Sequence, residues 1–403
     1  MYTRRHFLGK SLQFGSVVSL ASSIPCFLSR SLQAAENVVN DGRILVVIEL
    51  SGGNDGLNTV VPFADENYEK FRNTIRVPKS QVLKLNDEIG LHPAMDEAAK
   101  LVEDGRLAIV QGVGYPNPNR SHFESSAIWQ SAQLNPQDLG GYGWLGRALD
   151  VNSNRVRTFA DSISLGDFDP PLALRGRRST QSAIRKLEEL QLDSHLADVG
   201  STNSQNASDD LLQFVRRRTV DAQATAARIA KLTTGEATSV SYPGSELGTR
   251  LKSIARLIRA ELEPRVYYTQ QSGYDTHIDQ YNDHFQLLGQ FSSSLNAFLN
   301  DLKEAKLDDR VLVLVFSEFG RRVEENDSQG TDHGTAGPMF LAGPAVKAGL
   351  HGQTPDLTNL EDGDLKMTTD FRSVYATILS QWLSIDPAKC LSGQFETLEL
   401  LRV

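Results

Sequence analysis

Cysteine is nearly absent from this sequence of 403 residues, which contains only Cys26 and Cys390. Because Cys26 lies in an N-terminal segment that we expect to be removed, Cys390 is left alone and no disulfide can form within the mature chain. An excess of basic residues is also lacking, since the formal net charge is −9. The sequence therefore has no basic footprint for nucleic acid, and we expect none among its partners.

Long apolar runs and two common catalytic motifs are missing as well. No stretch is apolar over the roughly 20 residues that a membrane-spanning helix needs, so we expect no permanent membrane span. The glycine-rich segment 51–58 is not followed by the Gly-Lys-Ser/Thr of a phosphate-binding P-loop. No Gly-x-Ser-x-Gly elbow is present, which argues against a Ser-His-Asp hydrolase.

The N-terminal segment 1–35 has the pattern of a twin-arginine signal peptide. Arg4 and Arg5 precede Phe7 and Leu8, a weakly apolar, serine-rich stretch follows, and the segment ends in small residues suited to cleavage. A basic membrane-associated helix that is never cleaved is the alternative. We therefore expect export by the Tat pathway to the periplasm or the medium, with the Tat translocase as a partner during export.

The stretch 311–316 consists of six apolar residues and predicts a strand buried on both faces, as in a parallel sheet covered by helices. It leads directly into Ser317 and Glu318. In open α/β sheets ligands bind beyond the carboxyl ends of the strands, so a carboxylate at this position is a candidate for function. The alternative is that Glu318 only caps the next turn or pairs with Arg321 or Arg322.

The same arrangement recurs elsewhere in the chain. Apolar segments at 43–50, 107–112 and 265–270 each lead into a polar loop, and another polar loop precedes the apolar segment 338–342. The side chains expected at one edge of the sheet are Asp55, Ser121, Asp275, His277, Glu318, Asp332 and His333. Because converging acids and histidines need charge compensation, we expect a divalent metal ion there, with zinc, manganese and calcium as candidates.

Helical periodicity between these strands completes an α/β pattern. Segment 278–302 has apolar residues along one helical face and predicts a parallel β-α-β unit with the strands on either side of it. We expect a doubly wound, mostly parallel sheet with helices on both faces, forming one domain over 36–403. Two further predicted helices, at 209–232 and 246–262, belong to a helical insertion or cap over the active edge at about 151–263.

Ser121 follows a proline-rich turn and stands three residues before Glu124, which is the pattern of a helix N-cap. A hydroxyl at a helix N-terminus is also well placed for a nucleophile, because the helix dipole and the free amides stabilise negative charge. Both roles are open for Ser121. Its neighbour His122 fits a packing or capping histidine better than a metal ligand.

Five motifs together resemble the bacterial family known as domain of unknown function 1501. They are ELSGGNDGLNTVVP at 49–62, NRSHFESSAIWQ at 119–130, SGYDTH at 272–277, SEFGRR at 317–322 and GTDHGTAGP at 330–338. That family is similar to the alkaline phosphatase and sulfatase superfamily. The resemblance implies a doubly wound sheet with metals at the carboxyl ends of its strands. Glu318 departs from the Asp-His that the superfamily usually has at this position.

The resemblance and the residues together predict metal-dependent hydrolysis of a phosphate or sulfate ester, on a small molecule or a polysaccharide. The candidate metal ligands are Asp55, Asp275, His277, Glu318, Asp332 and His333. Ser121 is the expected nucleophile, and Arg120 or Arg321 is expected to pair with the ester oxygens. The alternative is a non-catalytic exported binding protein that keeps the fold, with or without a structural metal.

Overall fold

The computed structural model describes residues 42–135, 141–151, 160–187 and 238–402. A nine-stranded sheet runs through the middle of this part of the chain. Its strands are β1 (Ile44–Ser51), β5 (Leu107–Gly114), β6 (Ser162–Leu165), β7 (Gln181–Ile184), β8 (Val266–Ser272), β9 (Val311–Phe316), β10 (Gly337–Ala342), β11 (Gly349–His351) and β12 (Thr369–Asp370). A small antiparallel sheet is formed by β2 (Val60–Val61), β3 (Leu83–Lys84) and β4 (Gly90–Leu91).

The order across the large sheet is β11-β5-β10-β9-β1-β8-β6-β7, with β12 also paired to β5. The strand β10 runs antiparallel to both of its neighbours, and the remaining pairs are parallel. The sheet is therefore mostly parallel, as predicted. One detail differs from a simple β-α-β unit, because β1 lies between β8 and β9 and pairs with both.

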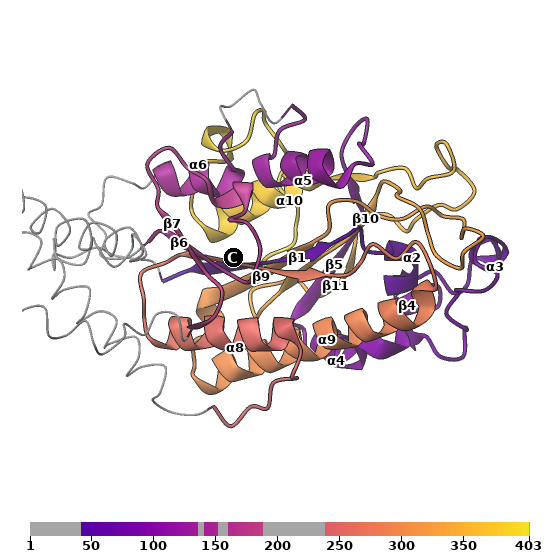
Figure 1. The fold of residues 1–403 in the computed structure, drawn as a ribbon, viewed down its shortest axis with the longest axis horizontal. Helices are drawn as coiled ribbons and strands as arrows, with labels where there is room; N and C mark the ends of the chain where they lie inside the picture. Colours follow the sequence, from indigo (N-terminus) through magenta and orange to yellow (C-terminus); the bar gives the residue numbers. More distant parts are fainter. Residues whose placement is uncertain (1–41, 136–140, 152–159, 188–237, 403) are drawn as a thin grey trace, which may run out of the picture.

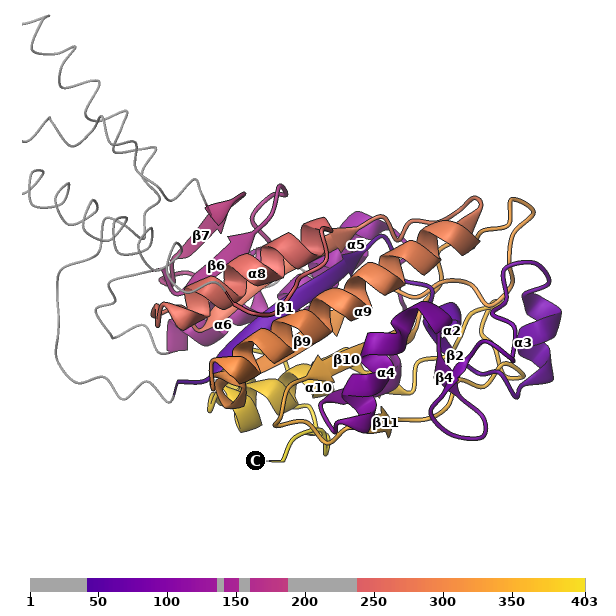
Figure 2. The same ribbon diagram turned by 90° about the horizontal axis from the view of Figure 1, so that it is seen from below.

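Helices cover both faces of the large sheet (Figures 1 and 2). The described α-helices are α2 (Gly56–Thr59), α3 (Glu66–Phe71), α4 (Asp96–Glu103), α5 (His122–Ser131), α6 (Trp144–Val151), α8 (Glu246–Arg259), α9 (Gln280–Glu304) and α10 (Phe371–Thr377). In Figure 1, α5, α6 and α10 lie on one side of the sheet and α4, α8 and α9 on the other. The doubly wound α/β fold is thus confirmed.

The apolar run of β9 explains this layering. Val311, Val313 and Val315 pack into the core on the α8 and α9 side. Leu312, Leu314 and Phe316 pack into the core on the α5 and α10 side. Alternate side chains of a strand point to opposite faces, so a continuous apolar run is what a strand buried on both faces requires. None of the described helices is both long and apolar enough to cross a membrane.

The expected helical cap at 151–263 needs correction in its described part. There β6 and β7 extend the large sheet beyond β8, and α8 packs against one face of that sheet. The two strands have four residues each, SISL and QSAI, and such short, weakly apolar segments carry little sequence signal. The helix predicted at 246–262 is α8, whereas the helix predicted at 209–232 lies outside the described residues.

The topology brings the polar loops to one edge. β1, β5, β8 and β9 all run in the same direction, so the loops that follow them share the carboxyl edge of the sheet. Because β10 is antiparallel, the segment 317–336 both leaves β9 and re-enters the sheet at this edge. This segment carries Glu318, Arg321 and His333.

Candidate metal centre

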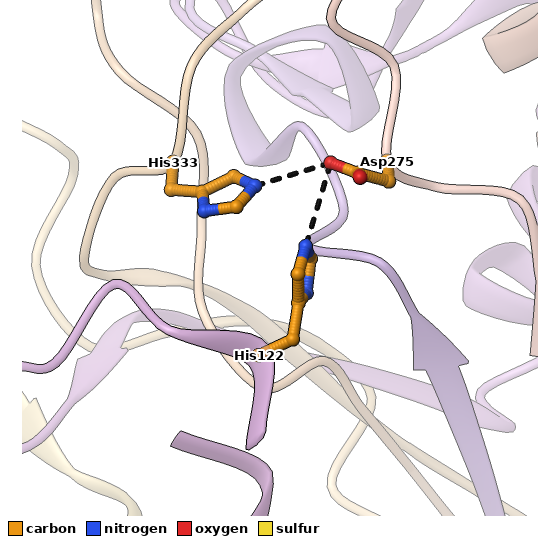
Figure 3. Close-up of side chains that lie close together, drawn as sticks. All are labelled: His122, Asp275 and His333. Atoms are coloured by element: carbon orange, nitrogen blue, oxygen red, sulfur yellow. Dashed lines mark hydrogen bonds and ion pairs between the residues drawn. The ribbon is translucent and has the colours of Figure 1, made fainter. Parts of the chain in front are cut away.

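Three side chains meet at the carboxyl edge: His122 from the first turn of α5, and Asp275 and His333 from two loops (Figure 3). Each offers a ligand atom, and these atoms lie within 4.8 Å of one another. Asp275 Oδ1 is 3.1 Å from Nε2 of His333 and 3.5 Å from Nε2 of His122.

His277 adds a third imidazole to this group. Its Nε2 lies 3.0 Å from Asp275 Oδ1 and 2.9 Å from Nε2 of His333. The three histidines therefore turn the same ring nitrogen, Nε2, toward one carboxylate oxygen. We call His122, Asp275, His277 and His333 the histidine cluster.

The outer nitrogen of each ring is held by an acceptor. Nδ1 of His122 lies 2.8 Å from Glu318 Oε1, and Nδ1 of His277 lies 3.1 Å from Asp332 Oδ1. Nδ1 of His333 donates to the backbone carbonyl of Arg120 at 2.7 Å. Carboxylate and carbonyl oxygens only accept, so a neutral ring with its proton on Nδ1 satisfies these outer contacts and turns its Nε2 lone pair inward. Such outer contacts are the usual way in which proteins orient histidines that bind metals.

The inward lone pairs repel one another and the nearby carboxylate unless a positive charge lies between them. Nε2 of His277 and Nε2 of His333 face each other at 2.9 Å, and both face the Asp275 carboxylate. Nε2 of His122 is buried and makes no hydrogen bond to the described residues. The hydrogen bond to Glu318 raises the pKa of His122, so a positive charge at its Nε2, carried by a proton or by a bound cation, is favoured. A divalent cation would supply that charge, and three imidazoles with one carboxylate suit zinc or manganese better than calcium.

Arg321 fixes the position of Asp275. Its guanidinium is fully buried and donates to Asp275 Oδ1 at 2.7 Å. It also donates to four backbone carbonyls, those of Gly52, Gly53, Tyr274 and Thr331. Burial raises the pKa of Asp275, but the hydrogen bond and the positive charge of Arg321, together with the contact to His333, outweigh it and bring the pKa to about 2. Arg321 was predicted to pair with ester oxygens. In the structure its donors are directed to Asp275 and to these backbone carbonyls, so it holds Asp275 in position.

Glu318 and Asp332 lie outside the ring of inward-facing nitrogens. Glu318 is buried, and its Oε1 accepts the amide of Gly52 at 2.8 Å as well as Nδ1 of His122. Asp332 Oδ1 accepts from Asn326 at 3.2 Å and from His277. Both residues were predicted as ligands. In the structure their carboxylates face the outer Nδ1 atoms of His122 and His277 and not the inward Nε2 atoms.

Asp55 is separate from the cluster. Its carboxylate is fully buried, forms an ion pair with Arg72 at 2.6 Å, and accepts from Gln280 Nε2 at 2.5 Å. It also accepts the amide of Asn58 at 3.4 Å as the N-cap of α2. Burial raises the pKa of Asp55, but the charge and hydrogen bonds of Arg72 overcome this and lower it. Arg72 thus compensates the charge of Asp55, which was predicted as a metal ligand and which the structure does not bring into the histidine cluster.

Ser121 and Arg120 lie beside the cluster. Ser121 is the N-cap residue of α5, but its side chain makes no capping hydrogen bond. It is exposed and stands in the chain between Arg120, whose carbonyl holds His333, and His122. The Arg120 side chain pairs with Asp364, so it faces away from the histidines toward a neighbouring pocket.

His122 is the cluster member that sequence analysis assigned to packing. A signal was available, since it is the first residue of a helix at the active edge and follows the candidate nucleophile. A single histidine in a helix is nevertheless common without a metal. What distinguishes His122 is the convergence with Asp275, which only the fold reveals.

The fold and this cluster define the class of protein: a doubly wound α/β protein with a candidate metal centre at the carboxyl edge of its sheet. Residues 43–396 match the family described as protein of unknown function DUF1501, and the chain belongs to that family. No functionally curated protein matches the sequence.

Several solved structures are similar to this chain. The zinc complex of the C-terminal periplasmic domain of EcEptC from Escherichia coli is 10% identical, with a TM-score of 0.40, over 75% of this chain and 72% of that one. A protein of the alkaline phosphatase superfamily from Vibrio parahaemolyticus is 9% identical, with a TM-score of 0.41, over 87% and 69%. The sulfatase PsFucS1 from Pseudoalteromonas sp. is 11% identical, with a TM-score of 0.36, over 89% and 70%.

Proposed function

We propose that this protein is an exported, metal-dependent hydrolase of phosphate or sulfate esters. The observation that carries the proposal is the convergence of three Nε2 atoms on Asp275 Oδ1, with every outer Nδ1 held by an acceptor. This is a preorganised donor set, because its ring orientations are determined by Glu318, Asp332 and the Arg120 carbonyl.

The histidine cluster would hold the cation. A bound divalent ion would act as a Lewis acid, stabilising negative charge on the ester oxygens. Arg321 keeps Asp275 ionised and in place, so the donor set is ready before any ion arrives. The buried Glu318 holds His122 in the orientation that binding needs.

Ser121 would be the attacking group. Its oxygen forms a bond to phosphorus or sulfur while the bond to the leaving alcohol oxygen breaks. The hydroxyl proton passes to solvent, to which Ser121 is exposed, and the leaving oxygen takes a proton from solvent. Water then cleaves the seryl ester, which restores the hydroxyl and releases phosphate or sulfate.

Turnover of simple esters tests the activity. The mature protein, loaded with zinc or manganese, is assayed with p-nitrophenyl phosphate and p-nitrophenyl sulfate. We expect turnover of at least one ester, lost with a chelator and restored by the same metal. His351→Ala is the matched control, because His351 lies on β11 with its Nε2 2.5 Å from the carbonyl of Lys347. A protein that binds metal and turns over neither ester would instead be the non-catalytic binding protein.

Export is tested separately from activity. Arg4 and Arg5 form the pair that the twin-arginine receptor recognises. Replacing both by lysine keeps the charge, and we expect the precursor to stay in the cytoplasm. Fractionation and immunoblotting measure the outcome, with Lys10→Arg as the control. An unchanged exported yield would rule out the twin-arginine assignment.

A further inference from the structure

A pocket of about 340 Å³ lies next to the histidine cluster. Its walls come from the loop after β5, the segment around Thr335 and the turn 361–364. Two connections join it to the cluster. Arg120 lines the pocket with its side chain while its carbonyl holds His333, and Thr335 follows His333 by two residues. A molecule in this pocket would therefore lie beside the candidate metal centre.

The turn 361–364 presents an acid to the pocket. Glu361 and Asp364 exchange backbone hydrogen bonds of 3.0 and 2.9 Å. Asp362 and Gly363 between them have φ of 50° and 82°. Positive φ at both central residues is typical of a tight two-residue hairpin turn, for which Asp-Gly is a favoured pair. The turn is tied to the active edge, because Arg322 donates to the Asp362 carbonyl at 3.1 Å.

Asp364 is the informative residue of this pocket. Its side chain is 1% exposed, and Oδ2 accepts from Nε of Arg120 at 2.9 Å and also from Nη2. Oδ1 makes no hydrogen bond to the described residues, and the Nε of Arg322 is 4.0 Å away. Because Oδ1 is covered from solvent, Asp364 serves the pocket by holding the Arg120 guanidinium, and the exposed carboxylates of Glu361 and Asp362 are the acceptors that a ligand can reach.

The remaining groups narrow the class of ligand. Glu361, Asp362 and Asp364 all line the pocket and disfavour an anion. The Arg120 guanidinium lies among them. Asp364 balances its charge, and its Nη1, which makes no hydrogen bond to the described residues, is left to donate to an oxygen of a ligand. A neutral hydroxyl both donates to a carboxylate and accepts from a guanidinium, so it suits both groups at once.

Apolar surface completes the pocket. Pro116, Pro118 and Met367 line it and are exposed to solvent. A sugar ring carries hydroxyls at its edge and C–H groups on its faces, and pockets of this size range accommodate small ligands. We infer that this pocket binds a neutral sugar unit, which carries the ester group attacked at the neighbouring centre. That the sugar carries an ester rests on the proposed function, whereas the binding of the sugar does not.

Sugar binding is measured without reference to activity. The mature protein is titrated with glucose, galactose, fucose and N-acetylglucosamine, and binding of each sugar is followed by saturation-transfer NMR. We expect at least one to bind, and Met367→Trp, which fills the pocket, to weaken it at least tenfold. Asp364→Asn is expected to weaken it as well, with metal content and melting temperature verifying the fold. The control Leu134→Trp changes an exposed side chain that does not line the pocket and should bind as wild type.

The outcomes separate the two proposals. Absence of binding for all four sugars, or binding unaffected by Met367→Trp, would overturn the inference about the pocket. Tighter binding of ethanolamine than of any sugar would overturn it too, because the ligand would then be a cation. Binding of a sugar without turnover of glucose 6-phosphate, glucose 6-sulfate or either p-nitrophenyl ester would leave the pocket assigned and count against the hydrolase.

Discussion

Replacement of His333 by alanine is expected to remove nearly all divalent metal from the purified protein. Nε2 of His333 is close to both Asp275 and His277, so its loss opens the middle of the donor set. Changes to residues that only orient a ligand typically weaken metal binding by about 10- to 100-fold, and loss of a ligand should cost at least about 100-fold. Elemental analysis of the protein as purified and calorimetric titration with zinc measure the effect.

A graded series makes this result specific. His122→Ala should lose metal as His333→Ala does, although sequence analysis assigned His122 to packing. Asp332→Asn should lose less metal, because the only atom of the histidine cluster that Asp332 is seen to contact is the outer nitrogen of His277. His351→Ala should keep wild-type metal content. A wild-type protein that is folded, prepared without chelator and free of metal would contradict the assignment of the centre, and full metal in His122→Ala would exclude His122 as a ligand.

The strands could be predicted well because their signal is local. The apolar run 311–316 coincides with β9, and the predicted segments 43–50, 107–112, 265–270 and 338–342 correspond to β1, β5, β8 and β10. Strands buried on both faces need apolar residues on both, whatever their neighbours are. The strands β6 and β7, of four residues each, could not be found in this way, since β6 joins the sheet by backbone pairing with β8 and β7 by pairing with β6.

The sequence predicts which loops form the site, but it does not predict what each side chain in them contacts. Asp275, His277 and His333 were expected together because parallel strands end at one edge, and they are together. Asp55 also follows a strand, but its carboxylate forms an ion pair with Arg72. Nothing in the sequence around Asp55 indicates this partner. Whether an acid could bind the metal or only orients a histidine depends on which ring nitrogen of that histidine it faces. That choice depends on side-chain packing in three dimensions.

The role of Arg321 illustrates the same limit. A guanidinium beside a candidate ester site suggests binding of the substrate, because arginine pairs well with phosphate and sulfate. In the fold its donors go to Asp275 and to backbone carbonyls of the neighbouring loops. A buried guanidinium must find such acceptors, since leaving it unpaired would be costly. The arginine therefore holds the loops together, which the sequence pattern could not distinguish from catalysis.

Ser121→Ala is expected to abolish ester turnover while leaving folding and metal content unchanged. Because the Ser121 side chain makes no capping bond, its removal should alter stability within about 0.5 kcal/mol, less than the roughly 1 kcal/mol lost with a functioning cap. Loss of a covalent nucleophile typically lowers kcat by at least about 10³-fold. The measurements are thermal unfolding, elemental analysis and kcat on whichever p-nitrophenyl ester the wild type hydrolyses.

Two companion variants distinguish a nucleophile from a helix cap. Ser121→Asp introduces a good capping side chain, so it should be at least as stable as wild type and still inactive. Ser126→Ala removes another serine hydroxyl of α5 and should retain activity, which controls for changes to the helix itself. Acid quenching during turnover, followed by peptide mass spectrometry, should find phosphate or sulfate on Ser121 in the wild type only. Full activity of Ser121→Ala with wild-type metal content would exclude the covalent step, and water would then be the attacking group.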